Sequence, residues 1–526
     1  MECEEGIRSR KLKALKPIQT KLDNHEDDYD HDGEEEPLSP PGRLFHEPNF
    51  SGHIIAIMGC KTKIIPDVVK AKLPQTLLKQ PRFSSFLVLD KKDGGEGKWV
   101  RTKVDLEKHI IVPDVDYKTM MMNYSSSDRF LEDYIYNLTK SNLDKSRPLW
   151  ELHLLNVKTS EAESVCIFKI HHSLGDGISL MSLLLACTRQ VSNPEALPML
   201  PTAAKKKKDL SESGRVHVRW LWRSLLGFWW LLELLGNTFV DAFMFIATAL
   251  FLKDTDTPIK GPPGTEYKPR RIVFKIVSLD DMKFIKNAMN ATINDVAVGV
   301  TQAGLSKYLN RRYDLDHDNK NIDGRETIEK NNLPKQIRLR SLLFINIRPS
   351  PGIQALADMM EKNTKAKWGN SFGCVVLPFT IALMDDPLDY INQAKANVDR
   401  KKHSLEALCT FSIIGLIFNF FGVKTASGLF QRLFLNTTMA FSNVVGPIEE
   451  IGFYGHPMAF LAASTYGQSN GLMINFQSYV NKMTIVVSVD EDTIPDPHQL
   501  LEDIAESLKL IKNRIIEKDV AKTSYN

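Results

Sequence analysis

VCIFKIHHSLGDGISLMSLLLACTR, the stretch from Val165 to Arg189, places two adjacent histidines and an aspartate between two apolar segments. The first segment, Val165–Ile170, has the β-branched and aromatic composition of a strand. The segment that begins at Gly177 has helix-forming residues with an apolar face. The sequence therefore predicts a strand-to-helix turn that carries the two histidines and the aspartate.

The adjacent histidines, His171 and His172, cannot both face one pocket. Neighbouring side chains of a strand point to opposite sides of the sheet, so we expect one ring to act in chemistry and the other to pack. Histidine transfers protons near neutral pH because its unperturbed pKa is about 6.5. We predict that His172 points into a channel while Asp176 folds back and braces the turn.

The rest of the motif admits other interpretations. Gly175 and Gly177 would permit a backbone conformation that residues with a Cβ resist. A lone buried histidine usually only packs, so a structural turn is the alternative, but the complete HHSLGDG pattern between a strand and a helix favours catalysis. A metal site would need a third ligand, and neither Cys166 nor Cys187 lies at ligand spacing. We therefore predict no metal.

Length and composition indicate a globular protein with a large core. The chain has 526 residues, of which 43% are hydrophobic and 25% charged, and this size predicts at least two lobes. The net charge of +3 argues neither for nor against nucleic acid as a partner. The lack of zinc-finger spacing, of a stacked-aromatic RNA motif and of a long basic helix argues against it. The six cysteines are scattered, which indicates buried thiols in a reducing compartment. No secretory signal peptide is expected in residues 1–21.

Charge and apolar patterns divide the chain into four parts. Residues 1–37 should be a disordered charged tail, because the acidic run at residues 25–36 cannot bury apolar surface. Residues 38–193 form the predicted N-terminal lobe. Residues 194–270 form a linker that contains a Lys205–Lys208 run, and residues 271–526 form the C-terminal lobe.

The linker contains the most apolar stretch of the chain, residues 220–252. A spanning helix needs about 20 predominantly apolar residues, and here it would carry Glu233 or Asp241 into hydrocarbon. Four tryptophans favour a helix or hairpin that lies in the bilayer surface. A single crossing would also leave the two lobes on opposite sides of the membrane. We therefore expect a surface or re-entrant insertion.

Strand and helix patterns alternate in both lobes. Helices are expected to begin at Asp280 or Asp281 and at Thr292 or Asn294, so that Asn294 and Asp295 are either helix caps or substrate contacts. Residues 411–421 form a second apolar patch that is either core or lipid contact. Strands are expected at residues 50–59, 83–89, 99–104, 150–155, 271–279, 341–349, 440–447, 471–479 and 483–489, and further helices at 387–403 and 498–512.

This constellation resembles the CoA-dependent acyltransferase superfamily and, within it, the plant bifunctional wax ester synthase and acyl-CoA:diacylglycerol acyltransferase family. The resemblance runs from about Leu38 to the C-terminus. The DFGWG motif of plant hydroxycinnamoyl-type acyltransferases is absent, and Asn481 stands where some bacterial members have glycine. The matching motifs are PLSPPGRLF at residues 37–45, Pro148-Leu149-Trp150, HHSLGDG at 171–177, Asn294-Asp295, SNVVGP from Ser442, and Ser478-Tyr479.

The resemblance implies an α/β (α+β) fold of two chloramphenicol-acetyltransferase-like lobes, with the active-site tunnel at their interface. It implies that His172 removes the proton of a fatty alcohol as its oxygen attacks an acyl-CoA thioester. The Asn294 amide is the candidate donor to the oxyanion. Asp176 should orient the turn through an ion pair, for which Arg348 is the candidate partner.

The implied function is transfer of a fatty acyl group from acyl-CoA, as co-substrate and without a bound cofactor, to a long-chain alcohol or diacylglycerol. The implied location is the cytosolic face of the endoplasmic reticulum membrane, with the plasma membrane as alternative. A soluble acyltransferase for small hydroxyls or amines and a non-enzymatic lipid-binding protein are the competing interpretations. The implied catalytic residues are His171, His172, Asp176, Gly177 and Asn294, and the implied substrate-binding residues are Pro148, Leu149, Trp150 and Asp295.

Overall fold

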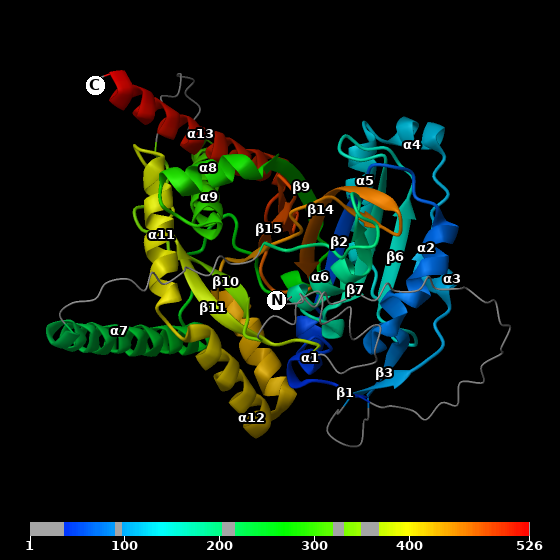
Figure 1. The fold of residues 1–526 in the computed structure, drawn as a ribbon, viewed down its shortest axis with the longest axis horizontal. Helices are drawn as coiled ribbons and strands as arrows, with labels where there is room; N and C mark the ends of the chain where they lie inside the picture. The colour runs from blue at the N-terminus through cyan, green and yellow to red at the C-terminus, as the bar shows by residue number, and fades with distance from the viewer. Residues whose placement is uncertain (1–35, 90–96, 202–215, 319–330, 349–367, 525–526) are drawn as a thin grey trace, which may run out of the picture. The chain divides into compact units, whose positions relative to one another are not determined.

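The computed structural model describes residues 36–89, 97–201, 216–318, 331–348 and 368–524. They belong to one compact unit (Figure 1). The predicted disordered tail and the Lys205–Lys208 run lie outside these residues, except that Glu36–Pro37, the end of that tail, forms strand β1. β1 joins β4 (Gly97–Arg101) and β3 (Ser85–Leu89) in a small three-stranded sheet.

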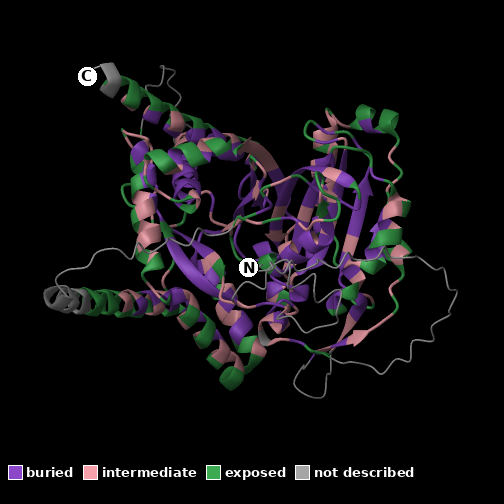
Figure 2. Cartoon of the chain, viewed as in Figure 1, coloured by how far each residue is buried: buried purple, intermediate pink, exposed green. Residues whose placement is uncertain are grey.

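A seven-stranded sheet forms the core of the first lobe. Its central strands are apolar along most of their length because both faces of the sheet are covered (Figure 2). The strand before the histidine turn, β7, pairs antiparallel with β2, and His171 lies opposite His53. In sheet order the strands are β5 (Ile110–Ile111), β6 (Trp150–Leu155), β7 (Ser164–His171), β2 (His53–Cys60), β14 (His456–Tyr466), β13 (Ile451–Phe453) and β8 (Thr188–Gln190).

A six-stranded mixed sheet forms the core of the second lobe. The pairs β10/β12 and β12/β15 are parallel, and the other neighbours are antiparallel. In order the strands are β11 (Phe372–Phe379), β10 (Leu339–Asn346), β12 (Met439–Val444), β15 (Leu472–Tyr479), β16 (Lys482–Val489) and β9 (Arg271–Ser278). Its main helices are α8 (Leu279–Ala288), α9 (Ile293–Asp318), α11 (Leu388–Lys402) and α13 (Pro497–Ser524).

Strand β14 joins the two halves of the chain. It comes from the C-terminal half, but it pairs with β2 in the first sheet, with Ala462 opposite Ile57. β13 and β8 extend the same sheet beyond β14. The two sheets therefore do not follow the sequence division at residue 270, and the sequence patterns did not predict β8, β13 or β14.

Two long apolar helices, α7 and α12, pack against each other (Figure 1). The stretch expected to form a helix or a hairpin is the single helix α7 (Val216–Leu250), so the hairpin interpretation is wrong. The second apolar patch lies in α12 (Glu406–Asn436), which Gly422 divides into two arms. Gly422 has a φ of 76°, which glycine adopts readily. Among the described residues, α7 from Leu226 and α12 are long and apolar enough to cross a membrane.

A buried ion-pair cluster ties the middle of α7 to the second lobe. The Asp241 side chain is fully buried and accepts from Arg400 Nη2 at 2.6 Å and Lys401 Nζ at 2.8 Å, both on α11. Lys401 also donates to Glu406 at 2.7 Å, and Glu406 accepts from the Val376 backbone N–H at 2.9 Å. Burial tends to raise the pKa of Asp241, but its ion pairs outweigh this and lower it.

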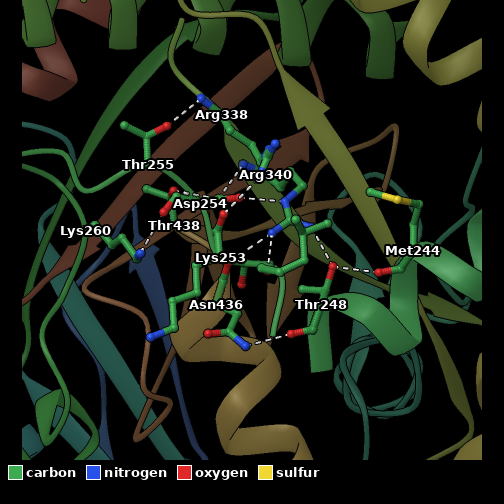
Figure 3. A network of polar contacts seen from close by, with 12 residues as sticks. Met244, Thr248, Lys253, Asp254, Thr255, Lys260, Arg338, Arg340, Asn436 and Thr438 are labelled. Atoms are coloured by element: carbon green, nitrogen blue, oxygen red, sulfur yellow. Dashed lines mark hydrogen bonds and ion pairs between the residues drawn. The ribbon is translucent and has the colours of Figure 1, made fainter. Parts of the chain in front are cut away.

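A second network ties the end of α7 to strand β10 (Figure 3). The buried Arg340 guanidinium donates to Asp254 Oδ1 at 2.6 Å and to the carbonyls of Leu252 and Asn436. Asn436, the last residue of α12, donates in turn to the Thr248 carbonyl at 2.7 Å. The C-terminal ends of α7 and α12 are thus fixed to the same strand.

Candidate active site

The strand-to-helix turn predicted from the sequence is present. Strand β7 ends at His171, a short 3-10 turn covers His172–Leu174, and helix α6 spans Gly177–Ala186. Asp176 is the N-cap residue of α6, and its Oδ1 accepts from the Ser179 backbone N–H at 3.0 Å. A carboxylate at this position accepts from an otherwise unpaired backbone N–H group and interacts favourably with the positive end of the helix dipole.

Asp176 forms the predicted ion pair with Arg348, and both side chains are only 9% exposed. Asp176 Oδ2 also accepts from the Ser371 N–H at 3.1 Å. Arg348 donates to Ser179 Oγ at 3.1 Å and to the Gly369 carbonyl at 2.9 Å. This ion pair fastens the turn of the first lobe to the segments around β10 and β11 of the second lobe.

His172 is held by a ring stack and by hydrogen bonds of its backbone. Its ring stacks on Phe45 with centroids 4.2 Å apart, and its backbone N–H donates to the Gly52 carbonyl at 2.9 Å. A Cβ at Gly52 would lie 2.8 Å from the Phe45 ring, so glycine makes room for this stack. Asn370 Nδ2 donates to the His172 carbonyl at 2.9 Å. Phe45 and Asn370 were not predicted as site residues.

The His172 imidazole is in an environment that favours its neutral form. Burial lowers its pKa, and its own carbonyl, the Asp176 carboxylate and Asn370 oppose this effect only in part. Its Nδ1 atom is buried and has no hydrogen-bond partner among the described residues. An imidazole that is neutral near pH 7 can accept a proton.

His171 lies in different surroundings. Its Nδ1 contacts Ser173 Oγ at 2.7 Å, and its ring stacks on His46 at 4.4 Å and meets the edge of His53 at 5.0 Å. Burial holds the pKa of His171 well below its usual range, and the nearby histidines lower it further. This is the packing position that strand alternation assigns to one of the two rings.

The prediction that the two glycines of the motif adopt a special backbone conformation is wrong. Gly175 has an extended backbone with φ 173°, and Gly177 begins a regular helix. Gly175 is explained by packing, because a Cβ there would lie 3.2 Å from the Trp368 ring. A Cβ at Gly177 would meet no atom within 4 Å.

The Pro148-Leu149-Trp150 motif lies in the core of the first lobe. Trp150 is fully buried, donates from Nε1 to the Phe83 carbonyl at 2.9 Å and stacks on His109. The Leu149 carbonyl accepts from the His171 N–H at 3.0 Å. These contacts support β7 and the turn, and substrate binding by these residues stays a prediction.

Asn294 and Asp295 are the second and third residues of helix α9. Asp295 is buried and forms a reciprocal cap with Thr292, in which each side chain accepts from the other residue's N–H. This is the simpler of the two roles considered for Asp295. Asn294 is exposed, and its Oδ1 accepts from Asn443 Nδ2 at 2.6 Å. The role of the Asn294 amide as an oxyanion donor stays a prediction.

An apolar cavity adjoins the turn, with an empty volume of about 790 Å³. It lies between one face of the first sheet, which contributes Ile54, Phe168 and Ile170, and the side of α6 that begins at Gly177. Val444 and Gln477 from the second lobe also line it. The cavity suits a hydrocarbon chain. Within the described ranges, no group of three or more histidine, cysteine, aspartate or glutamate residues could hold a metal ion.

Comparisons with known proteins agree in sequence and in fold. The family model "Wax ester synthase/diacylglycerol acyltransferase catalytic domain" matches residues 53–297, and "WS/DGAT C-terminal domain" matches residues 368–512. In Arabidopsis thaliana, wax ester synthase/diacylglycerol acyltransferase 11 is 49% identical, with coverage of 92% of this chain and 96% of that protein. Its relative numbered 4 is 50% identical, with coverage of 92% and 91%.

Solved structures with low sequence identity share the fold. The wax ester synthase/diacylglycerol acyltransferase from Marinobacter aquaeolei VT8 has a TM-score of 0.55 at 16% identity, with coverage of 91% of this chain and 99% of that one. The first condensation domain of the calcium-dependent antibiotic synthetase has a TM-score of 0.51 at 10% identity, with coverage of 88% and 91%. The predicted two-lobed α/β fold class is confirmed. The chain belongs to the wax ester synthase/diacylglycerol acyltransferase family.

Proposed function

We propose that this protein transfers a fatty acyl group from acyl-CoA to the hydroxyl of a long-chain alcohol or of diacylglycerol, with His172 as the general base. Family membership supports the reaction class. The observation that carries the assignment of the base is the environment of His172. Its ring is held by Phe45, its pKa is lowered by burial, and the Asp176–Arg348 ion pair fixes the turn on which it lies.

The proposed reaction needs a single proton carrier. An alcohol is a weak nucleophile until its proton is removed. His172 takes the hydroxyl proton while the oxygen attacks the thioester carbonyl carbon and forms a tetrahedral intermediate. The carbon–sulfur bond then breaks, and the imidazolium returns the proton to the departing thiolate of CoA. Asp176 positions the turn and favours the imidazolium, and the Asn294 amide is the proposed donor to the oxyanion.

We propose that α7 and α12 place the enzyme in the surface of a bilayer. Most large apolar side chains of α7 from Leu226 onward are exposed, and α12 exposes a smaller group of them (Figure 2). Trp229, Phe239, Phe420 and Phe421 are 70%, 75%, 76% and 68% exposed. Contiguous exposed apolar side chains of this size are typical of membrane contact, and aromatic rings favour the headgroup region.

The buried polar contacts of Asp241 and Asp254 support insertion of α7 in the bilayer surface rather than a helix that crosses the bilayer. Asp241 points into the protein and pairs with α11, so its charge is neutralised without contact with lipid. A crossing helix would draw α11 and β10 into hydrocarbon along with Asp241 and Asp254, at a high cost in desolvated polar groups. Insertion from one side keeps both lobes together. We propose the cytosolic face of the endoplasmic reticulum as the location, with the plasma membrane as alternative.

The test of this function is an assay of the full-length protein in phosphatidylcholine vesicles with radiolabelled palmitoyl-CoA. Hexadecanol and dioleoylglycerol are supplied in separate reactions, and the products are separated by thin-layer chromatography. We expect a wax ester, a triacylglycerol or both from the wild type, and neither from a folded His172→Ala variant. Inactivity of the wild type with both acceptors would favour a non-enzymatic lipid-binding role. Turnover of a water-soluble alcohol or amine without vesicles, at the rate seen with the lipid acceptors, would favour a soluble acyltransferase for small hydroxyls or amines.

A further inference from the structure

We propose that the groove between α7 and α12 binds the hydrocarbon chain of the acceptor lipid, which enters from the bilayer and reaches His172 past Phe50 and Phe45. The groove has apolar walls and an empty volume of about 490 Å³. Phe245 and Ala249 of α7 form one side, and Ile417 and Phe430 from the two arms of α12 form the other. This inference rests on the proposed function, because it assigns one of its two substrates to a binding site.

A continuous series of aromatic contacts joins this groove to the candidate base. Phe430 lines the groove, and its ring centroid lies 5.6 Å from that of Phe50. Phe50 lies 5.3 Å from Phe45, and Phe45 stacks on His172 at 4.2 Å. All three phenylalanines are buried in one apolar cluster, which also contains groove residues of α7. Within the part of the chain that the structure describes, apolar rings in contact with one another thus join the groove to the His172 ring.

Phe50 and Phe45 close the path in this structure. Phe45 directly follows the short helix α1 (Pro40–Leu44), and Phe50 ends the 3-10 turn Pro48–Phe50. Both rings thus belong to one short connection rather than to a strand of either sheet. A chain that enters from the groove has to displace Phe50 and pass beside Phe45, which keeps its stack on His172. We therefore assign Phe50 the role of a gate between the bilayer and the site.

The chemistry of the two substrates assigns the groove to the acceptor. An ester joins two long chains at one bond, so two apolar sites must meet at the base. The cavity beside α6 reaches the turn at Gly177, whereas the groove ends at Phe430 and is joined to His172 through the rings of Phe50 and Phe45. Acyl-CoA carries a highly charged group and arrives from water. Long-chain alcohols and diacylglycerol dissolve in the bilayer, and the groove lies between the two helices with lipid-exposed faces.

Neighbouring residues of α12 offer a matched test. Ile417 lines the groove, whereas Leu416 is 55% exposed and does not line it. Ile417→Trp should fill the groove and raise the KM for hexadecanol about tenfold or more, with no change in the KM for palmitoyl-CoA or in turnover of hexanol. Leu416→Trp should leave all three values unchanged. Equal effects of the two variants, no effect, or a change in the KM for palmitoyl-CoA would overturn the proposal.

A binding measurement separates this site from catalysis. The probe is a C16 alcohol with a terminal diazirine, photolysed with the full-length protein in phosphatidylcholine vesicles and mapped by mass spectrometry. We expect labelling of groove residues that excess hexadecanol competes away, in the wild type and in His172→Asn alike. Labelling that hexadecanol does not reduce, or that falls only on the outer faces of α7 and α12, would overturn the site. Ester formation in the same vesicles tests the proposed function independently of this result.

Discussion

Removal of the Arg348 guanidinium should leave the buried Asp176 carboxylate without its ion-pair partner and loosen the candidate active site. Both side chains of the Asp176–Arg348 pair are 9% exposed, and loss of one partner of a buried pair costs about 3–5 kcal/mol. Asp176 would keep its bonds from the Ser179 and Ser371 N–H groups, so we place Arg348→Met near the lower end, at about 3 kcal/mol. Asp176→Asn leaves Arg348 bonded to Ser179 Oγ and the Gly369 carbonyl, for which we expect about 2 kcal/mol.

The double variant distinguishes a coupled pair from two independent side chains. The double variant Asp176→Asn with Arg348→Met leaves no unpaired buried charge, so it should lower the free energy of unfolding by about 3 kcal/mol rather than by the sum of about 5. The difference is a coupling energy of about 2 kcal/mol. Urea denaturation of the four proteins in matched detergent micelles gives the free energies of unfolding from midpoints at a common slope. Additive effects, with a coupling below about 0.5 kcal/mol, would refute the conclusion that this ion pair fastens the turn to the second lobe.

Three further outcomes follow from the same geometry. Because burial lowers the pKa of His172, kcat/KM with a short-chain alcohol should stay constant through neutral pH and fall only below about pH 6.5. Asp176→Asn removes a carboxylate that raises this pKa, so the acidic fall of its kcat/KM should move to lower pH. An unchanged pH profile would contradict the proposed interaction between Asp176 and His172. Gly177→Leu should project into the cavity and reduce activity with long-chain relative to short-chain acyl-CoA by about tenfold, measured as a chain-length profile that Ser179→Ala does not reproduce. Asp241→Ala should lower the free energy of unfolding by about 1–3 kcal/mol through loss of the anchor to Arg400 and Lys401, and an unchanged urea midpoint would show that the cluster does not hold α7.

Local patterns predicted the turn because the signal is local. The apolar run before His171, the helix-forming segment after Gly177 and the capping aspartate lie within 25 residues, and the structure places them as strand, turn and helix. Alternation along a strand also predicts the different surroundings of His171 and His172. The prediction of a special glycine backbone was wrong, because Gly175 is extended and its small size matters through the tight contact that a Cβ would make with Trp368.

Contacts between residues far apart in the sequence were harder to predict from local patterns. β14 joins the first sheet although it pairs with β2 across about 400 residues, and its apolar run resembles that of any buried strand. Phe45 lies in a motif that the resemblance identifies, but nothing in its neighbours predicts that its ring stacks on His172. In the same way, Asp241 looked like a charge exposed to lipid until its partners on α11 were known.

The most direct test of His172 as the base is the same substitution at the two adjacent histidines. Asparagine can keep the polar contact of His171 with Ser173 through its amide oxygen, but it cannot accept a proton near neutral pH at either position. In the vesicle assay with palmitoyl-CoA and hexadecanol, His172→Asn should reduce kcat by roughly 100- to 10,000-fold, while a folded His171→Asn retains most of its activity. Near wild-type turnover by folded His172→Asn would contradict the account.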